Sequence, residues 1–182
     1  MPIELRHFDP RSGAGKRTRA LYHAAFPPEE RPPFSFLCRR ARRPGAAFYT
    51  AQDGDRWVGF AYVIANDTLA YVFFLAIDPA ARGQGYGSAI LAALQERYTG
   101  RCLFLAVEAL DDPEAPNRAE RLRRQAFYEK NGFHLLHGKL REAGVVYDLM
   151  GTGEAPTRAA HRALMDAYLG PFWRHFVRME IL

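Results

Sequence analysis

Three glycines occupy alternate positions in the segment RGQGYGS, and a helix-forming apolar run follows it at once. Glycine has no side chain, so a loop built in this way lets backbone N–H groups approach a ligand closely. The positive end of the helix that follows adds an electrostatic attraction for anions. The segment is therefore predicted to bind an anionic group through Arg82, Gly83, Gln84, Gly85, Tyr86, Gly87 and Ser88.

Two nucleotide-binding motifs compete with this interpretation. Residues 13–18, GAGKRT, resemble the end of a P-loop, but Pro10 stands where the first glycine belongs and Arg17 replaces the Ser or Thr after the lysine. The three glycines of the later segment follow G-x-G-x-G, whereas the dinucleotide fingerprint is G-x-G-x-x-G and lies closer to its strand. Glu108 stands about 20 residues further on, as the ribose-binding acid of that fingerprint does, so this alternative stays open.

The segment LAIDPAARGQGYGSAIL closely resembles the acyl-CoA loop of the GNAT superfamily of N-acyltransferases. That loop has Arg or Gln, two residues, Gly, one residue, and Gly or Ala, which Arg82, Gly85 and Gly87 match. Residues 123–133, RRQAFYEKNGF, resemble the second signature helix of the family. The resemblance runs from the first strand to Met150. It implies an α/β (α+β) fold with a mixed, mostly antiparallel central sheet flanked by helices, and an acetyl-CoA-dependent N-acetyltransferase.

Acetyl transfer to an amine needs a neutral amine, a place for the developing oxyanion and a proton for the departing thiolate. An alkylammonium has a pKa of about 10.4, so a carboxylate that removes its proton, directly or through water, would help. Glu108, at the end of the apolar run CLFLAVE, is the candidate, although it could instead bind structure or acceptor without acting as a base. The resemblance implies that Tyr128 is the general acid, and packing is its alternative role. It also implies that the pantetheine arm pairs with backbone groups that polarise the thioester, those of Leu75, Ala76 and Ile77.

The signature helix departs from the family pattern at two positions. Arg121 and Arg124 stand where the family has an asparagine and an alanine. Asn117 lies about three helical turns before Tyr128, so we do not expect it to replace the missing asparagine. Either arginine could instead reach a phosphate of CoA.

Apolar runs and turn residues predict the elements that position these side chains. The turns at 53–55 and 66–67 join three runs into consecutive antiparallel strands. The third, Leu69–Ile77, shows no polar alternation, which is typical of a central strand covered on both faces. This run is followed by the segment RGQGYGS, which we call the glycine loop (residues 82–88), and then by a helix and the run Cys102–Glu108. This succession predicts a right-handed crossover and parallel pairing of the two strands. Strands are predicted over 3–7, 46–52, 57–64, 69–77, 102–108, 133–136 and 145–150, and helices over 18–26, 34–42, from the glycine loop to Gly100, and 117–130.

Residues 151–157, GTGEAPT, mark the one convincing boundary in the sequence. We therefore expect an acetyltransferase domain over 1–150 and a C-terminal helical extension over 151–182. The aromatic tail of the extension must be covered, either by the same domain, which we favour, or by a second copy in a homodimer. One helical face of the extension is predicted to carry Ala160, Leu164, Ala167 and Tyr168.

The composition excludes several classes of protein. Hydrophobic residues make up 48% of the 182 residues, which supports one domain with a sizeable core. The longest apolar run has nine residues, whereas a membrane helix needs roughly 20, so we expect no membrane segment. The N-terminus lacks the apolar region of a signal peptide, so we expect a cytoplasmic protein. Two cysteines and scattered histidines predict neither a disulfide framework nor a metal site.

The net charge of +5 is concentrated in two arginine-rich patches, residues 38–43 and 117–124. Such patches could hold phosphates, so a non-catalytic module that binds CoA or nucleic acid is the alternative to an enzyme. The joint presence of Glu108 and Tyr128 favours the enzyme, and we do not expect nucleic acid as its partner. The acceptor is expected to be an amine of a small molecule or peptide, which acidic side chains could attract: Glu29, Glu30, Asp111, Asp112 and Glu114.

Overall fold

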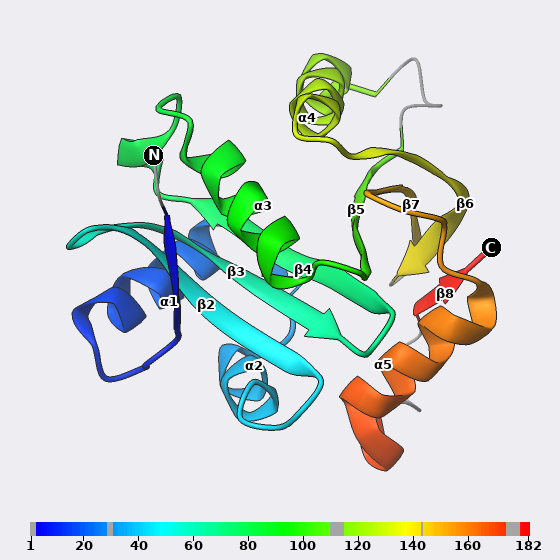
Figure 1. The fold of residues 1–182 in the computed structure, drawn as a ribbon, viewed down its shortest axis with the longest axis horizontal. Coiled ribbons are helices and arrows are strands. Elements are labelled where there is room, and N and C mark those ends of the chain that lie inside the picture. Colours follow the sequence, from blue (N-terminus) through cyan, green and yellow to red (C-terminus); the bar gives the residue numbers. More distant parts are fainter. Residues whose placement is uncertain (1–2, 29–30, 110–114, 143, 174–178) are drawn as a thin grey trace. The chain divides into compact units, whose positions relative to one another are not determined.

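The computed structural model describes residues 3–28, 31–109, 115–142, 144–173 and 179–182. In this part of the chain, eight strands and five α-helices form a mixed, mostly antiparallel α/β fold, as predicted (Figure 1). The strands are β1 (Glu4–His7), β2 (Ala46–Asp53), β3 (Arg56–Ala65), β4 (Leu69–Ile77), β5 (Cys102–Glu108), β6 (His134–Glu142), β7 (Val145–Gly151) and β8 (Met179–Ile181). Their order in the sheet is β1-β2-β3-β4-β5-β7-β6-β8. The chain divides into two compact units, Met1–Ile64 with Val72–Thr99 and Ala65–Tyr71 with Gly100–Leu182, so β4 contributes to both.

In the first unit, β2 and β3 form the predicted hairpin, and β3 packs closely against the end of β4. β2 pairs antiparallel with β1 on one side and with β3 on the other. Gly54 in the β2–β3 turn has a φ of 59°, a left-handed conformation that favours glycine. Gly59 in β3 has no room for a side chain, because a Cβ there would lie 2.3 Å from the Ala76 carbonyl oxygen. The core of this unit is largely aromatic, with tilted and edge-to-face contacts among Tyr22, Phe26, Phe48, Phe60 and Phe74.

The first helix begins earlier than the sequence pattern predicted. Ser12 caps it by accepting a hydrogen bond from the N–H of Gly15 at 2.9 Å. Gly15 does not break the helix but lets it lie against Asp9, whose carbonyl oxygen would be 2.3 Å from a Cβ. The P-loop-like residues 13–18 are therefore helical. The helices of the first unit are α1 (Gly13–Ala25), α2 (Phe34–Arg40), the 3-10 helix η2 (Pro79–Ala81) and α3 (Tyr86–Arg97).

The second unit contains the predicted parallel pair and the predicted hairpin. β4 pairs parallel with β5 over residues 69–71, with Ala70 opposite Leu103. β7 lies antiparallel between β5 and β6. β6 continues past its predicted end at Leu136, and its pairing with β7 shifts between Leu135 and Lys139.

The C-terminal residues supply a helix and an edge strand. The helices of the second unit are α4 (Arg118–Lys130) and α5 (Arg158–Trp173). α5 is interrupted at Gly170, which has a φ of 74° and precedes Pro171. β8, which no pattern predicted, pairs antiparallel with β6. Leu164 and Tyr168 of the predicted helical face are buried, but Ala167 is exposed. None of the helices in the described residues has both the length and the hydropathy needed to cross a membrane.

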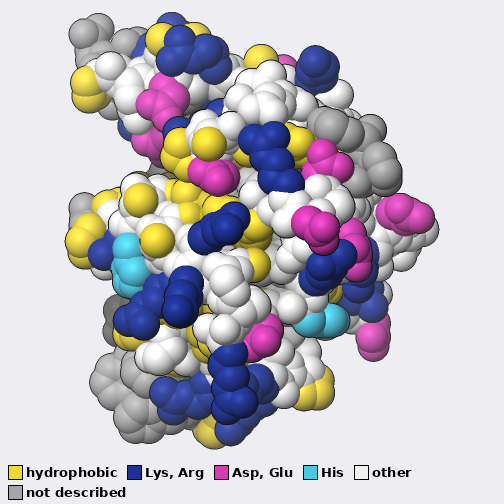
Figure 2. Space-filling model, turned by 90° about the vertical axis from the view of Figure 1, so that its left-hand side faces the viewer, with side chains coloured by type: hydrophobic (Ala, Val, Ile, Leu, Met, Phe, Trp, Pro, Cys, Tyr) yellow, Lys and Arg dark blue, Asp and Glu magenta, His cyan; other side chains and the backbone are white. Residues whose placement is uncertain are grey.

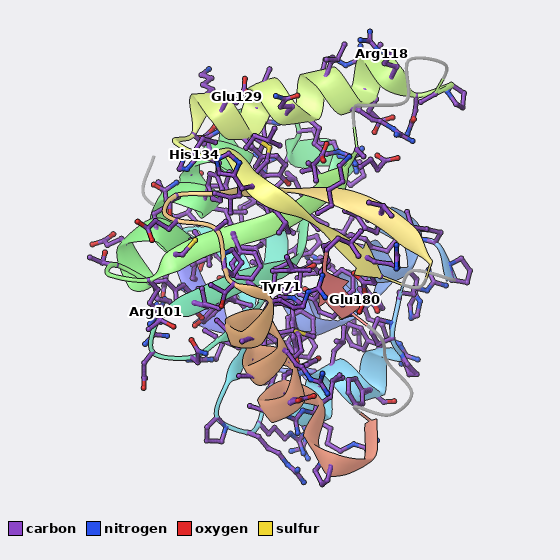
Figure 3. All side chains as sticks on the ribbon, turned by 90° about the vertical axis from the view of Figure 1, so that its right-hand side faces the viewer. Tyr71, Arg101, Arg118, Glu129, His134 and Glu180 are labelled. Atoms are coloured by element: carbon purple, nitrogen blue, oxygen red, sulfur yellow. The ribbon has the colours of Figure 1, made fainter. Side chains whose placement is uncertain are left out.

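α5 packs within the second unit through a buried histidine. The side chain of His161 is fully buried, and its ring centroid lies 6.2 Å from that of Tyr71, which Figure 3 labels, and 6.3 Å from that of Phe104. Neither ring nitrogen finds a hydrogen-bond partner among the described residues. Burial lowers the pKa of His161 from 6.5 to about 4, so the folded protein holds a neutral imidazole.

We expect this histidine to make the folded state less stable in mild acid. Above pH 6.5 the imidazole is neutral in both states, whereas below it the unfolded chain binds a proton that the folded protein excludes. The free energy of unfolding should therefore fall from pH 6.5 down to about 4, by roughly 3 kcal/mol in total.

Urea unfolding of the wild type and of His161→Leu across this pH range measures the effect. The variant should lose this part of the pH dependence, whereas His137→Leu, at an exposed position, should retain it. Equal pH dependence in the wild type and in His161→Leu would contradict the prediction.

Candidate active site

The glycine loop joins η2 to α3 in the first unit. Asp78 caps η2, with its Oδ1 accepting from the N–H of Ala80 at 3.2 Å. Gly83 and Gly85 have φ values of 74° and 84°, so both adopt left-handed conformations that disfavour other residues. A Cβ at either glycine would meet nothing within 4 Å. Their conformation, and not crowding by the protein, thus requires glycine, and the space in front of them is open.

The backbone N–H groups of residues 83–88 have no well-formed hydrogen bond to another described residue. Gly85 is the N-cap of α3, and the first hydrogen bond of the helix runs from Ala89 N–H to the Gly85 carbonyl at 3.1 Å. Several N–H donors at the positive end of a helix form an anion site.

Two predicted binding residues turn their side chains toward the protein. The buried ring of Tyr86 places its hydroxyl 2.8 Å from Asp53 Oδ2, to which it donates. Gln84 Nε2 donates to the Ala80 carbonyl at 3.0 Å, and its Oε1 accepts from Arg56. These side chains hold the loop, so their role in binding is carried by their backbone. Sequence reasoning missed Asp53 and Arg56, because they come from the β2–β3 turn.

The end of β4 differs from the predicted strand covered on both faces. From Phe73 onward, buried residues alternate with half-buried ones, so Leu75 and Ile77 are partly exposed while Ala76 is buried. Arg82, itself exposed, donates from Nε to the Ile77 carbonyl at 3.4 Å. The backbone pairing of Leu75, Ala76 and Ile77 with a pantetheine arm stays a prediction.

In the second unit, side chains of α4 surround the carboxylate at the end of β5. Asn117 Nδ2 donates to Glu108 Oε1 at 2.8 Å, and Arg124 donates to Glu108 Oε2 at 2.7 Å. Arg121 Nε lies 3.5 Å from Oε1 and donates to the Asn117 side chain at 2.7 Å. We call Glu108, Asn117, Arg121 and Arg124 the Glu108 cluster.

The Glu108 cluster explains the departures from the family pattern. Arg121 and Arg124 both engage Glu108, so their positive charge serves an internal ion-pair network. Asn117, for which we expected no role, is instead a direct partner of the carboxylate. Both oxygens of Glu108 accept hydrogen bonds, yet its side chain remains 28% exposed and can still be approached. Figure 3 shows α4 between the labelled Arg118 and Glu129.

Tyr128, on the same helix, packs its ring between two phenylalanines. Its half-buried ring lies 5.2 Å from that of Phe127 and 5.9 Å from that of Phe133. No described residue forms a hydrogen bond with its hydroxyl. Burial raises the pKa of Tyr128, and the nearby Arg124 partly opposes this shift. The phenol therefore keeps its proton at neutral pH and has it available for donation.

The two arginine-rich patches behave differently. Arg121 and Arg124 of the second patch are bound to carboxylates, whereas Arg39, Arg42 and Arg43 are exposed and form no ion pair with a described residue. Lys and Arg side chains gather on the lower part of the face drawn in Figure 2. In the described part of the chain, no group of three or more His, Cys, Asp or Glu side chains could hold a metal ion. The acidic residues proposed to attract the acceptor lie outside the described residues: Glu29, Glu30, Asp111, Asp112 and Glu114.

Comparison with protein families gives a match over the region that contains the glycine loop and the candidate residues of β5 and α4. A model described as an acetyltransferase (GNAT) domain matches residues 44–135, from just before β2 into β6. This range includes the glycine loop, Glu108 and Tyr128. No curated protein matches the sequence.

Solved structures share the fold. A protein from Bacteroides thetaiotaomicron, assigned to the GNAT family of acetyltransferases, is 24% identical with a TM-score of 0.74, over 94% of this chain and 98% of that chain. An aminoglycoside 6'-N-acetyltransferase complexed with coenzyme A is 21% identical with a TM-score of 0.59, over 86% of this chain and 100% of that chain. The ribosomal-protein-S18-alanine N-acetyltransferase from Escherichia coli is 19% identical with a TM-score of 0.57, over 84% and 96% of the two chains.

Proposed function

The chain belongs to the GNAT family of acetyltransferases, and we propose that it transfers the acetyl group of acetyl-CoA to a primary amine of a small molecule or peptide. The amine nitrogen attacks the thioester directly, so that the C–N bond forms and the C–S bond breaks. The nitrogen gives up a proton to water beside Glu108, and the departing thiolate takes one from Tyr128. We expect the protein to act in the cytoplasm. The glycine loop binds the co-substrate, while Glu108 and Tyr128 serve the amine and the thiolate.

The observation that carries this proposal is that the N–H groups of residues 83–88 form no well-formed hydrogen bond within the part of the chain that the structure describes. Coenzyme A contains a diphosphate, whose oxygens can accept several N–H hydrogen bonds at once. The helix dipole of α3 and the exposed cation of Arg82 add attraction for that charge. Left-handed glycines keep side chains out of this space, which supports a close approach of the phosphates to the backbone.

Tyr128 is proposed as the general acid. Its raised pKa and its hydroxyl without a described partner suit a group that gives its proton to a departing thiolate. A thiol with a pKa of about 8.5 is already a tolerable leaving group, so this donation accelerates the reaction without being indispensable.

Glu108 is proposed as the carboxylate that assists the amine. Asn117 and Arg124 already donate to its two oxygens, so direct removal of a proton from the amine would compete with these contacts. The arrangement favours a carboxylate that orients the amine, or a water beside it, through its remaining lone pairs. Because the arginines of the Glu108 cluster fix its rotamer, the amine would meet a rigid acceptor of hydrogen bonds.

Glu108→Gln is expected to raise the KM of the amine about tenfold, because the charge that orients it is lost. The Kd of acetyl-CoA and the kcat should change by less than about threefold. Steady-state kinetics with Glu129→Gln as a control tests this, since Glu129 is an exposed carboxylate on α4 bound to Gln125. A large fall in kcat at unchanged KM would contradict orientation and identify Glu108 as the base.

A thiol-release assay tests the proposed function itself. Acetyl-CoA is offered with a panel of polyamines, aminoglycosides, amino acids and peptides, and the product amide is confirmed by mass spectrometry. We expect turnover with at least one amine, above the rate of acetyl-CoA hydrolysis. Tight CoA binding without turnover on any acceptor would contradict the enzyme and favour a CoA-binding module.

A further inference from the structure

The β2–β3 turn reaches the glycine loop through one exposed arginine. Arg56, the first residue of β3, donates from Nη1 to Gln84 Oε1 at 3.2 Å and from Nη2 to the Ala80 carbonyl at 3.1 Å. Its guanidinium lies over the ring of Tyr86, 5.5 Å from the centroid. Figure 1 shows the β2–β3 turn and the loop before α3 at the same end of the first unit. The loop thus has a cation that its own motif does not contain.

The surrounding contacts fix the position of this arginine. Tyr86 donates to Asp53, and Gln84 donates to the same Ala80 carbonyl that Arg56 contacts. We call Asp53, Arg56, Gln84 and Tyr86 the Arg56 network. Two hydrogen bonds and an aromatic face restrain the guanidinium before any ligand arrives, so less side-chain entropy is lost when it binds one.

Arg56 keeps part of its hydrogen-bonding capacity for a ligand. It forms no ion pair with a described carboxylate, although two acidic residues, Asp53 and Asp55, precede it at the β2–β3 turn. Asp53 instead accepts the hydroxyl of Tyr86. A guanidinium has five N–H donors, so Arg56 keeps donors to spare after binding Gln84 and Ala80. The guanidinium thus lies against Gln84 and Tyr86, two residues of the loop whose N–H groups form no well-formed hydrogen bond with a described residue.

We infer that Arg56 binds a phosphate of coenzyme A and is a second cation of the site beside Arg82. The inference rests on the proposed function, because it concerns the same co-substrate. Coenzyme A offers two phosphate groups for this contact, the diphosphate and the 3'-phosphate, and a guanidinium binds both by the same chemistry. The other members of the Arg56 network are positioning residues, which hold the guanidinium against the loop: Asp53, Gln84 and Tyr86.

Calorimetric titration of the full chain with CoA and with 3'-dephospho-CoA tests this inference. Arg56→Gln should weaken CoA binding about tenfold, the order expected when one charge-assisted contact is lost. Arg56→Lys should lose less affinity, because lysine keeps the positive charge although it lacks the paired N–H donors of a guanidinium. The matched control is Arg43→Gln, an exposed arginine of the same unit without an ion pair to a described residue, and its affinity should stay unchanged.

The salt dependence separates phosphate binding from a structural role. If Arg56 pairs with a phosphate, Arg56→Gln lowers the slope of log Kd against log salt by about one charge, while the melting temperature of the free protein stays the same. Equal losses for both ligands identify the diphosphate, and a loss confined to CoA identifies the 3'-phosphate.

Two results would overturn the inference: wild-type affinity in Arg56→Gln, or weaker binding with an unchanged salt slope. Either result would leave the proposed function intact. Failure of the wild type to bind either ligand would remove the proposed function and the inference together.

Discussion

Gly85→Ala is expected to weaken acetyl-CoA binding about 100-fold, or roughly 2.7 kcal/mol. Gly85 has a φ of 84°, and an alanine there favours a right-handed conformation by roughly 1 to 2 kcal/mol. Relaxation of this strain turns the neighbouring N–H groups away from the diphosphate, and the new methyl group occupies the open space in front of them. The methyl group obstructs the ligand and not the protein, because no atom beyond the neighbouring residues lies within 4 Å of that Cβ. Calorimetry with acetyl-CoA measures the loss.

Gly100→Ala is the matched control for this substitution. Gly100 follows the other end of α3, has a φ of 83° and likewise faces open space. The two variants should therefore lose a similar free energy of unfolding, about 1 kcal/mol. Only Gly85→Ala should lose affinity. Equal affinities in the two variants would show that the loop conformation does not matter for binding.

Tyr128→Phe is expected to lower kcat about 100-fold while leaving the Kd of acetyl-CoA unchanged. The substitution removes only the hydroxyl, which forms no hydrogen bond with a described residue, so the stability of the protein should not fall. The rate falls because the thiolate must then leave without a proton, or take one from water. Residual activity should remain, because a thiol with a pKa of about 8.5 can leave as the unprotonated thiolate, although more slowly.

Tyr49→Phe gives the opposite signature and is the control. The hydroxyl of Tyr49 lies 3.1 Å from that of Tyr98 in the core of the first unit. Its loss should lower the free energy of unfolding by about 1 kcal/mol without changing kcat. Wild-type kcat in Tyr128→Phe would exclude the tyrosine as the acid and assign it to packing.

Strands and the glycine loop were predictable because short-range pattern decides them. The bounds of β4 and β5 agree with the predicted runs Leu69–Ile77 and Cys102–Glu108, since long apolar segments between turn residues have few alternatives. The left-handed glycines of the loop are likewise a local property. The predicted start of α1 at residue 18 was too late, because Gly13 and Gly15 are poor helix formers and the serine cap before them was not recognised.

The side-chain networks could not be predicted, because they depend on contacts between distant residues. Arg56 lies 28 positions from Gln84, and its role appears only when the β2–β3 turn meets the loop. Asn117 was judged by its distance from Tyr128 along the helix, whereas its partner is Glu108 at the end of β5. β8 is three residues long, too short for a periodic pattern, and its pairing with β6 forms it. The roles assigned to Glu108 and Tyr128 stay predictions.

Titration of the full chain with coenzyme A by calorimetry tests most directly whether the N–H groups of residues 83–88 bind its diphosphate. We predict saturable binding of one CoA per chain with a micromolar Kd, weakened by salt and by Gly85→Ala but not by Gly100→Ala. Absence of a binding heat at millimolar CoA, confirmed by an unchanged melting temperature, would contradict the account.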